Sequence, residues 1–375
     1  MGCSMSPLDP AYRRRVLAFR AAGHHLDRRL PHGQLLAAIG TVGVRDVRAS
    51  GLASLHARVE GVTAHDLSNQ RASGAVLEVI SARGTDTLVP ANDVAVFTIG
   101  TIPSDEESLR ARLKPWLGVL DRSGHTAVDA VEAAKDAARE ALANGPLAVG
   151  ELSTALTARL PELSDMCHGR CGAVHIVQGL FDLAGESGLW HQANIDGTRR
   201  CIAMPEPTDA ASARRELVRR YLGCYGPATP AQLAEWCGLG VADAARSLAE
   251  ADTVQVSPRR YLLAEDVRRF ESPPVIAGTR VLPPRDPYLL DRDRSTLIPD
   301  RDKQKEVWRA TPIDGVVLVE GVPAATWRSR KAGHHLALQV RAFRTLSKDT
   351  LVALRHEAAA IAAHRDCKAS DVVIT

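Results

Sequence analysis

Three residues with metal-binding side chains lie close together in the sequence. Cys167, Cys171 and His175 are spaced four residues apart, so on one helix they would share a face. Thiolate and imidazole are ligands that suit zinc. However, structural zinc motifs usually present closer cysteine pairs, Asp165 is the only obvious fourth ligand nearby, and buried free cysteine is common. We therefore expect free thiols here, with no metal site and no cofactor.

Clustered arginines offer a second kind of chemistry, the binding of phosphate groups. Between Tyr12 and Arg58, nine arginines are opposed only by Asp27 and Asp46. Because a guanidinium forks onto phosphates and guanine edges, a concentrated basic segment is typical of a surface that binds a polyanion. The net charge of the whole chain is only +3. The inference therefore rests on where the arginines are clustered and not on the net charge of the chain.

Two more basic stretches lie towards the C-terminus. Arg292 and Arg294 alternate with Asp291 and Asp293, which fits either a self-paired charged loop of little energetic value or the lining of a DNA groove. The second stretch fits a basic hairpin against phosphates and, about equally well, a plain solvated turn. It contains Arg328, Arg330, Lys331, His334 and His335.

Composition and motifs exclude several classes of protein. No apolar run approaches the roughly 20 residues needed to span a membrane, and the start lacks the basic and apolar regions of a signal peptide. Seven scattered cysteines favour a reducing cytoplasm over a disulfide framework. The chain also lacks a glycine-rich phosphate loop with its lysine and a Gly-x-Ser-x-Gly elbow. We expect a cytoplasmic protein that is not attached to a membrane.

An internal repeat predicts the element order. Asn144-Gly145-Pro146-Leu147 recurs as Tyr225-Gly226-Pro227-Ala228, and Leu152 corresponds to Leu233 at the same offset of 81 residues. Each copy predicts a helix, a Gly-Pro break, a second and a third helix, and two short strands. Three helices followed by a two-stranded ribbon form a winged helix.

The second copy shows this pattern most clearly. Thr229 caps its middle helix, and Pro230 occupies the first position, where a missing N–H costs nothing. Arg259 and Arg260 form the basic tip of the ribbon. The predicted elements are helices over about 209–222, 230–237 and 241–250 and strands over 253–256 and 261–263. In the first copy, the third helix is predicted to run through 176–183, and the wing strands lie near 189–190 and 200–203.

The remaining segments are less regular. Residues 12–115 are expected to be mostly helical, with strand-like or loop stretches near Leu88 and Val96–Ile99. Strands over 316–319, 325–327 and 336–340 and a closing helix over 348–363 are predicted near the C-terminus. The fold class is thus α+β, mainly helical, with tandem winged-helix (helix-turn-helix) modules and a C-terminal β-rich element. The expected domains are an N-terminal winged-helix-like module with the basic segment (12–118), two winged helices (125–205 and 209–272), and the β-rich element with its helix (275–375).

Several short motifs follow one another in a characteristic order. They are Gly43-Val44-Arg45-Asp46, Leu55 to Val62, Arg83-Gly84-Thr85 before Asp93, Arg220-Tyr221-Leu222 with Tyr225-Gly226-Pro227, Trp236 with Gly238-Leu239, Asp286 to Leu290, Arg292-Asp293-Arg294, and Thr326-Trp327-Arg328. In this order the chain resembles, along nearly its whole length, the AlkZ/YcaQ-like family of winged-helix DNA glycosylases and its DNA-binding relatives. The resemblance implies three winged helices and a β-rich element that together form a concave, DNA-holding shape.

The resemblance also implies a catalytic position. The family's enzymes carry Gln, a middle residue, and Gln or Asp just after a Gly-aliphatic pair, and this motif falls on Arg45-Asp46-Val47. Hydrolysis of an N-glycosidic bond passes through an oxocarbenium-like cation, which needs a polar or negative group and a held water. Arg45 and Val47 cannot supply them. Asp46 has the right chemistry one residue out of register, so it is the candidate catalytic residue, against an Arg45–Asp46 surface pair or helix cap.

We therefore predict a DNA-binding winged-helix protein that resembles base-excision repair glycosylases acting on alkylated or crosslinked bases, with a degenerate catalytic motif. The alternative is a non-enzymatic winged-helix DNA-binding or transcriptional regulatory protein. The expected partner is double-stranded DNA, alkylated in the repair case, and repeated modules in one chain favour a monomer. The predicted DNA-binding residues are Arg45, Arg48, Arg259, Arg260, Arg292, Arg294, Arg328, Arg330, Lys331, His334 and His335.

Overall fold

The computed structural model describes residues 9–45, 50–103, 105–167, 171–309, 311 and 313–375, and it divides the chain into two compact units. The first unit comprises Met1–Gln70, Arg220–Ala228 and Thr253–Thr375, and the second comprises Arg71–Arg219 and Thr229–Asp252. Helices make up about 50% of the residues and strands 22%, so the predicted mixed α and β fold is confirmed. In the described part of the chain, no helix has both the length and the apolar character required to cross a membrane.

The first unit begins with a long helix. In α1 (Pro10–Gly23), Asp9 caps the N-terminus and Pro10 stands in the first turn, where proline is tolerated. Its buried face carries Val16, Leu17 and Phe19. The shorter helices α2 (Leu35–Gly40), α3 (Ser50–His56) and α4 (Ala64–Ala72) follow.

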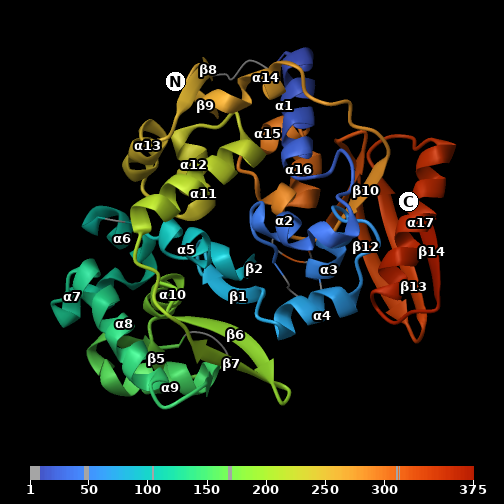
Figure 1. The fold of residues 1–375 in the computed structure, drawn as a ribbon. Coiled ribbons are helices and arrows are strands. Elements are labelled where there is room, and N and C mark those ends of the chain that lie inside the picture. Colours follow the sequence, from blue (N-terminus) through green and yellow to red (C-terminus); the bar gives the residue numbers. More distant parts are fainter. Residues whose placement is uncertain (1–8, 46–49, 104, 168–170, 310, 312) are drawn as a thin grey trace. The chain divides into compact units, whose positions relative to one another are not determined.

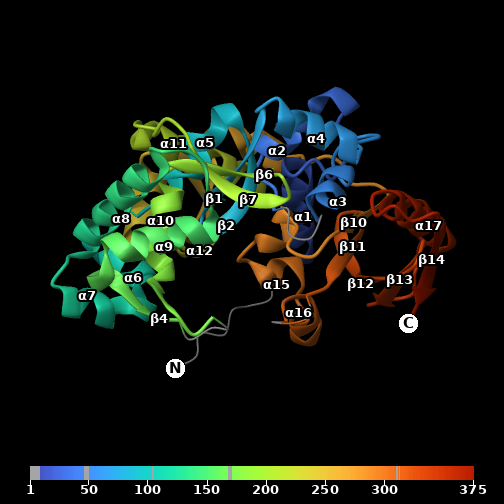
Figure 2. The same ribbon diagram turned by 90° about the horizontal axis from the view of Figure 1, so that it is seen from below.

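A sheet in the order β10-β11-β12-β13-β14 forms the C-terminal part of the first unit. Its strands are β10 (Thr279–Leu282), β11 (Gly315–Val319), β12 (Val322–Ala332), β13 (His335–Ala342) and β14 (Ala369–Ile374). Neighbouring strands are antiparallel except β13 and β14, which are parallel. Helix α17 (Lys348–Ala363) connects these two and covers one face of the sheet (Figures 1 and 2). The predicted strands and closing helix are confirmed, whereas the sequence did not predict β10 and β14.

Each face of this sheet packs against a separate apolar layer. Val317 and Trp327 point toward Leu354 of α17. On the opposite face, Val316 packs with Tyr288 and with apolar residues of the preceding short elements. The other elements of the first unit are β8 (Thr253–Ser257), β9 (Arg260–Leu263), α14 (Val267–Glu271), α15 (Arg294–Leu297) and α16 (Arg301–Val307).

The second unit is built around a sheet in the order β2-β1-β6-β7-β3. Alanines line the buried face of its longest helix, α8, so that α9 and α10 can approach closely. The strands are β1 (Val76–Ser81), β2 (Thr85–Pro90), β3 (Leu147–Ala148), β6 (Trp190–Ile195) and β7 (Thr198–Ala203). The helices are α5 (Val94–Phe97), α6 (Glu106–Arg112), α7 (Leu117–Ser123), α8 (Ala127–Leu142), α9 (Val149–Arg159), α10 (Gln178–Glu186), α12 (Pro230–Cys237) and α13 (Val241–Ala249). Helix α11 (Ala210–Tyr225) begins in the second unit and ends in the first.

The predicted elements of the internal repeat are present in both copies. Leu152 in α9 and Leu233 in α12 are both fully buried, as equivalent core positions should be. Thr229 caps α12 and Gly238 ends it in a left-handed conformation. The division into four domains stays a prediction.

Two local predictions are wrong. Ile176 does not begin a helix: with Val174 it lies in β5 (Val174–Ile176), which pairs with β4 (Ser164–Met166) in a hairpin between α9 and α10. Branched side chains at alternate positions fit a strand better than the first turn of a helix. Val96 and Phe97, expected in a strand or loop, lie in the short helix α5.

A buried carboxyl group attaches the turn between β1 and β2 to α10. Arg83 and Gly84 of this turn have positive φ angles, and the Gly84 N–H donates to Glu186 Oε1 at 2.5 Å. Arg112 pairs with the same oxygen, while Oε2 has no hydrogen-bond partner among the described residues. Burial raises the pKa of Glu186 to about 8, because Arg112 offsets only part of the lost hydration. The side chain is therefore held largely protonated near neutral pH.

This raised pKa predicts a pH-dependent stability. The folded chain holds the Glu186 proton up to about pH 8, whereas the unfolded chain releases it near 4.5, so the free energy of unfolding should fall as the pH rises between these values. One proton limits the slope to about 1.4 kcal/mol per pH unit. In Glu186→Gln, chemical denaturation at pH 5, 6, 7 and 8 should show a flatter profile than the wild type. Glu162→Gln, at an exposed position, should follow the wild type; parallel profiles for all three proteins would refute the prediction.

Candidate nucleic-acid interface

The segment that carries the predicted catalytic motif leads from α2 to α3. Gly43 has a φ angle of 73°, in the left-handed region, and Val44 is buried. Arg45 is half-buried, and the Ser50 hydroxyl at the start of α3 donates to its carbonyl oxygen at 3.3 Å. Asp46, Val47 and Arg48 lie outside the described residues. The catalytic role of Asp46 and the DNA contact of Arg48 therefore stay predictions.

A buried ion pair fixes the helix that follows this motif. Arg58 donates to both carboxylate oxygens of Asp286, at 2.8 and 2.7 Å, and the Ser54 hydroxyl of α3 donates to the same carboxylate. All three side chains are almost fully buried. Two parallel N–H···O bonds between charged groups are strong and geometrically specific. The carboxylate also accepts a hydrogen bond from the Tyr288 N–H at 3.0 Å, so both of its oxygen atoms have hydrogen-bond donors.

A second buried network fixes α1. Arg20 donates to Asp291 at 2.6 Å and to Asp293 at 3.1 Å, and Arg260 of β9 donates to Asp293 at 2.9 Å. Burial alone would raise the pKa of Asp293, but the two guanidinium groups outweigh it and hold the pKa below its ordinary value. The prediction of a self-paired charged loop is wrong, because the partners of both aspartates come from distant parts of the chain.

Several arginines of the basic N-terminal segment are bound to acceptors inside the protein. Besides Arg20 and Arg58, Arg29 pairs with Glu357 at 2.6 Å, and Arg13 donates to the backbone carbonyls of the last two residues of α15. Arg14, Arg15 and Arg28 are exposed. The positive charge that this segment can offer to a polyanion is therefore smaller than the sequence suggests.

Arg292 stands between the two buried aspartates in the sequence, and Arg294 follows them. Arg292 and Arg294 are both half-buried. The Arg294 guanidinium stacks over the Trp308 ring, 5.1 Å from its centroid. A contact of these residues with DNA stays a prediction.

The predicted basic hairpin is the turn between β12 and β13. Arg330 and Lys331 are exposed near its tip; Lys331 donates to the Arg365 carbonyl at 2.8 Å, and for Arg330 no ion pair is found among the described residues. His334, also exposed, lies in the turn. Farther from the tip, Arg328 of β12 pairs with Asp314, whereas His335, opposite Ala332 beside the turn, lies 3.0 Å from Asp371. The hairpin thus presents the exposed side chains of Arg330 and Lys331 near its tip, while the charge of Arg328 is paired farther along β12.

The turn between β8 and β9 separates its two arginines. Arg259 is exposed with a φ angle of 59°, while Arg260 turns inward to Asp293 and to the Pro227 carbonyl at 3.1 Å. Of the two predicted contacts, only Arg259 has a freely exposed side chain in this structure.

Sequence reasoning missed a polar cluster at the end of α3. His56 Nε2 lies 3.3 Å from Glu357 Oε2, and its ring packs edge-on against His364. Burial raises the pKa of Glu357, but contact with His56 and Arg29 outweighs this and lowers it. A carboxylate that orients an imidazole can support proton transfer. No local signal could reveal the cluster, because its members are about 300 residues apart in the sequence.

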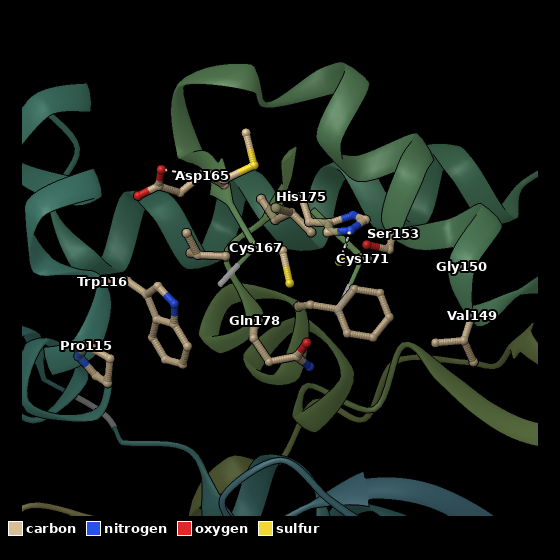
Figure 3. A pocket seen from close by; sticks show the side chains of 14 residues that line it. Pro115, Trp116, Val149, Gly150, Ser153, Asp165, Cys167, Cys171, His175 and Gln178 are labelled. Carbon is tan, nitrogen blue, oxygen red and sulfur yellow. Dashed lines mark hydrogen bonds between the residues drawn. The ribbon is translucent and has the colours of Figure 1, made fainter. Parts of the chain in front are cut away.

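In the second unit, the β4–β5 hairpin brings Cys167, Cys171 and His175 together (Figure 3). Their ligand atoms all lie within 4.8 Å of one another, and Cys171 Sγ is 3.2 Å from His175 Nε2. The pKa of Cys171 is lowered to about 7. The largest causes are hydrogen bonds with the Cys167 side chain and the Ala173 backbone, and the hydrogen bond with His175 has a smaller effect. The side chains border a pocket of about 560 Å³ that is also lined by apolar residues of neighbouring elements. The three residues share a site, but not the helix face that the spacing predicted.

The buried Arg58–Asp286 pair predicts a large loss of stability when one partner is removed. Asp286→Ala leaves a guanidinium buried without its counter-ion, which typically costs about 3–5 kcal/mol. Chemical denaturation followed by circular dichroism should show this loss. Asp302→Ala, which removes an exposed carboxylate paired with Lys305, should leave the midpoint unchanged. Equal midpoints for the two variants would contradict the anchoring role of Asp286.

The sequence and the structure of the chain are both similar to those of known DNA glycosylases. The family model described as "DNA glycosylase AlkZ-like" matches residues 42–364. Among solved structures, the Streptomyces sahachiroi DNA glycosylase AlkZ superimposes with a TM-score of 0.73 at 20% identity, covering 96% of this chain and 99% of that chain; this likeness shows a shared fold. No curated protein matches the chain. The match over residues 42–364 establishes that the chain belongs to the AlkZ-like DNA glycosylase family.

Proposed function

We propose that this protein binds duplex DNA that carries alkylated bases and acts on it as a base-excision repair protein. The observation that carries the proposal is the family match over residues 42–364, which includes the Arg45 segment, the buried Arg58–Asp286 pair and the basic hairpin. The exposed cations at the β12–β13 tip and Arg259 supply the charge that a phosphate backbone requires.

Winged-helix modules are the proposed scaffold for this binding. In the first copy, β3 lies between α8 and α9 in the sequence and pairs with β7, at Leu147↔Cys201. In the second copy, Ala228 lies between α11 and α12 and pairs with Tyr261 of β9. Two helices separated by a short extended segment that joins the ribbon, with a third helix before the ribbon, support a winged-helix arrangement in each copy. The third helices, α10 and α13, are the proposed recognition helices.

For excision we propose Asp46 as the carboxylate that stabilises the oxocarbenium-like cation and positions water. Removing it should abolish cleavage without abolishing binding.

A second candidate function is DNA binding without excision. It is favoured by Arg45 at the position of the family's first glutamine, because a guanidinium opposes a developing positive charge and suits a phosphate. The two functions share the same DNA surface and differ only in the chemical step.

The binding surface can be tested by fluorescence anisotropy with a labelled duplex at several salt concentrations. We expect Arg330→Ala/Lys331→Ala to bind more weakly and to reduce the slope of log K against log salt by about 2, since two phosphate contacts are lost. Lys305→Ala/Lys348→Ala removes the same charge from exposed helical positions and serves as the matched control. Identical slopes for both double variants would exclude the hairpin, and no binding by the wild type at low salt would exclude DNA binding altogether.

Excision is tested separately on an alkylated duplex treated with alkali, which breaks the strand at abasic sites. Strand breaks above background that disappear in Asp46→Asn, but persist in Asp302→Asn, would establish the enzymatic function. Saturable binding of the wild type without breaks, over a panel of alkylated duplexes, would establish the second candidate instead.

A further inference from the structure

We propose that Cys167, Cys171 and His175 form a zinc site in the β4–β5 hairpin of the second unit. Among the described residues, they form a group in which one ligand atom from each side chain lies within 4.8 Å of the others. The proposal does not depend on DNA binding or on excision.

The distances fit a tetrahedral ion after a small adjustment. With Zn–S near 2.3 Å and Zn–N near 2.0 Å, tetrahedral geometry places ligand atoms roughly 3.5–3.8 Å apart. Cys171 Sγ and His175 Nε2, at 3.2 Å, are already close to this separation. Cys167 is half-buried and Cys171 is exposed. Their side chains can therefore move by about the ångström that an ion would require.

The hairpin itself explains why the residues meet. Cys167 follows β4, and its N–H donates to the Ala173 carbonyl at 2.9 Å, which closes the hairpin. His175 stands in β5 directly opposite Asp165. Residues i and i+2 of a strand share a face, so Asp165, Cys167 and His175 are on one side of the hairpin.

The donor set selects the metal class. Two thiolates and an imidazole suit zinc and other thiophilic ions, and are poor ligands for magnesium or calcium. Asp165 is not the fourth ligand in this arrangement: its carboxylate accepts the Met166 N–H at 2.8 Å, pairs with Arg122 at 3.4 Å and points away from the sulfur atoms (Figure 3). The three side chains line the pocket of about 560 Å³, so water or a small ligand in this pocket can supply the fourth ligand.

The site has a structural consequence for α10. In the second copy of the repeat, Gly238 to Gly240 alone connect α12 to α13, whereas the corresponding connection in the first copy contains the whole hairpin. His175 stands three residues before α10 begins at Gln178. A bound ion would cross-link the turn region of the hairpin to β5, immediately before the proposed recognition helix.

The test is a metal analysis of the full chain, produced without a polyhistidine tag, kept reduced and passed through a metal-free desalting column. Plasma mass spectrometry should find about one zinc per chain in the wild type. Cys167→Ser/Cys171→Ser and His175→Ala should each lower the zinc content at least tenfold. Cys367→Ser and His65→Ala, which remove the same functional groups elsewhere, and Asp165→Ala should retain it.

A second measurement uses the unaltered chain and is independent of how the variants fold. Alkylation followed by peptide mapping should label Cys167 and Cys171 slowly as purified and rapidly after a chelator is added, with no change at the buried Cys224. Substitution with Co²⁺ should give thiolate charge-transfer absorption that the double variant lacks. Wild type without metal, whether its two thiols are free or joined in a disulfide, would overturn the proposal, as would zinc that persists in the double variant. Loss of zinc in Asp165→Ala would overturn the open fourth position.

Discussion

The first unit depends on arginine side chains that are removed from water and neutralised by aspartates of a single short segment. Asp286, Asp291 and Asp293 receive Arg58 and Arg20, so that α1 and the end of α3 are held to the residues that precede α15. A charged group in the interior is tolerated only when its donors and acceptors are matched, and here the guanidinium forks make several charge-assisted bonds each. Ser54 and Arg58, which follow the motif in the sequence, are thereby held at a defined place.

The same ion pairs reduce the number of arginines that can bind a phosphate group. An arginine in the sequence indicates a possible phosphate contact, but only an exposed arginine with no internal counter-ion can make one at little cost. Arg20, Arg58 and Arg260 are structural by this criterion, and Arg259 and Arg330 are available. Both available arginines lie in or near turns, and the N-terminal segment offers less positive charge than its composition indicates, because Arg20 and Arg58 are paired internally.

Local patterns predicted the elements that depend on local physics. Proline at the start of α12, glycine after it, the continuous apolar run of β11 and the alternating apolar residues of β13 each indicate a conformation within a few residues. The sequence failed where the deciding partner is remote. The sequence around Asp291 does not indicate that Arg20 is its partner, and the sequence around His56 does not indicate that Glu357 is its partner. The cysteine cluster lies between these cases: its members were identified, but a helical spacing was assumed for a segment whose branched residues form a hairpin.

The interleaving of the two units in the sequence has a consequence for biosynthesis. Arg58 and Arg20 are separated from their aspartates by 228 and 271 residues, so these bonds cannot form until more than three quarters of the 375 residues have been synthesised. The second unit lies nearly continuously between the two parts and can collapse while translation continues. Until then, the nascent N-terminal arm carries unpaired guanidinium groups beside a strongly anionic ribosomal RNA surface. Its folding is therefore expected to be late, and to be slowed by the contact order that its own ion pairs impose.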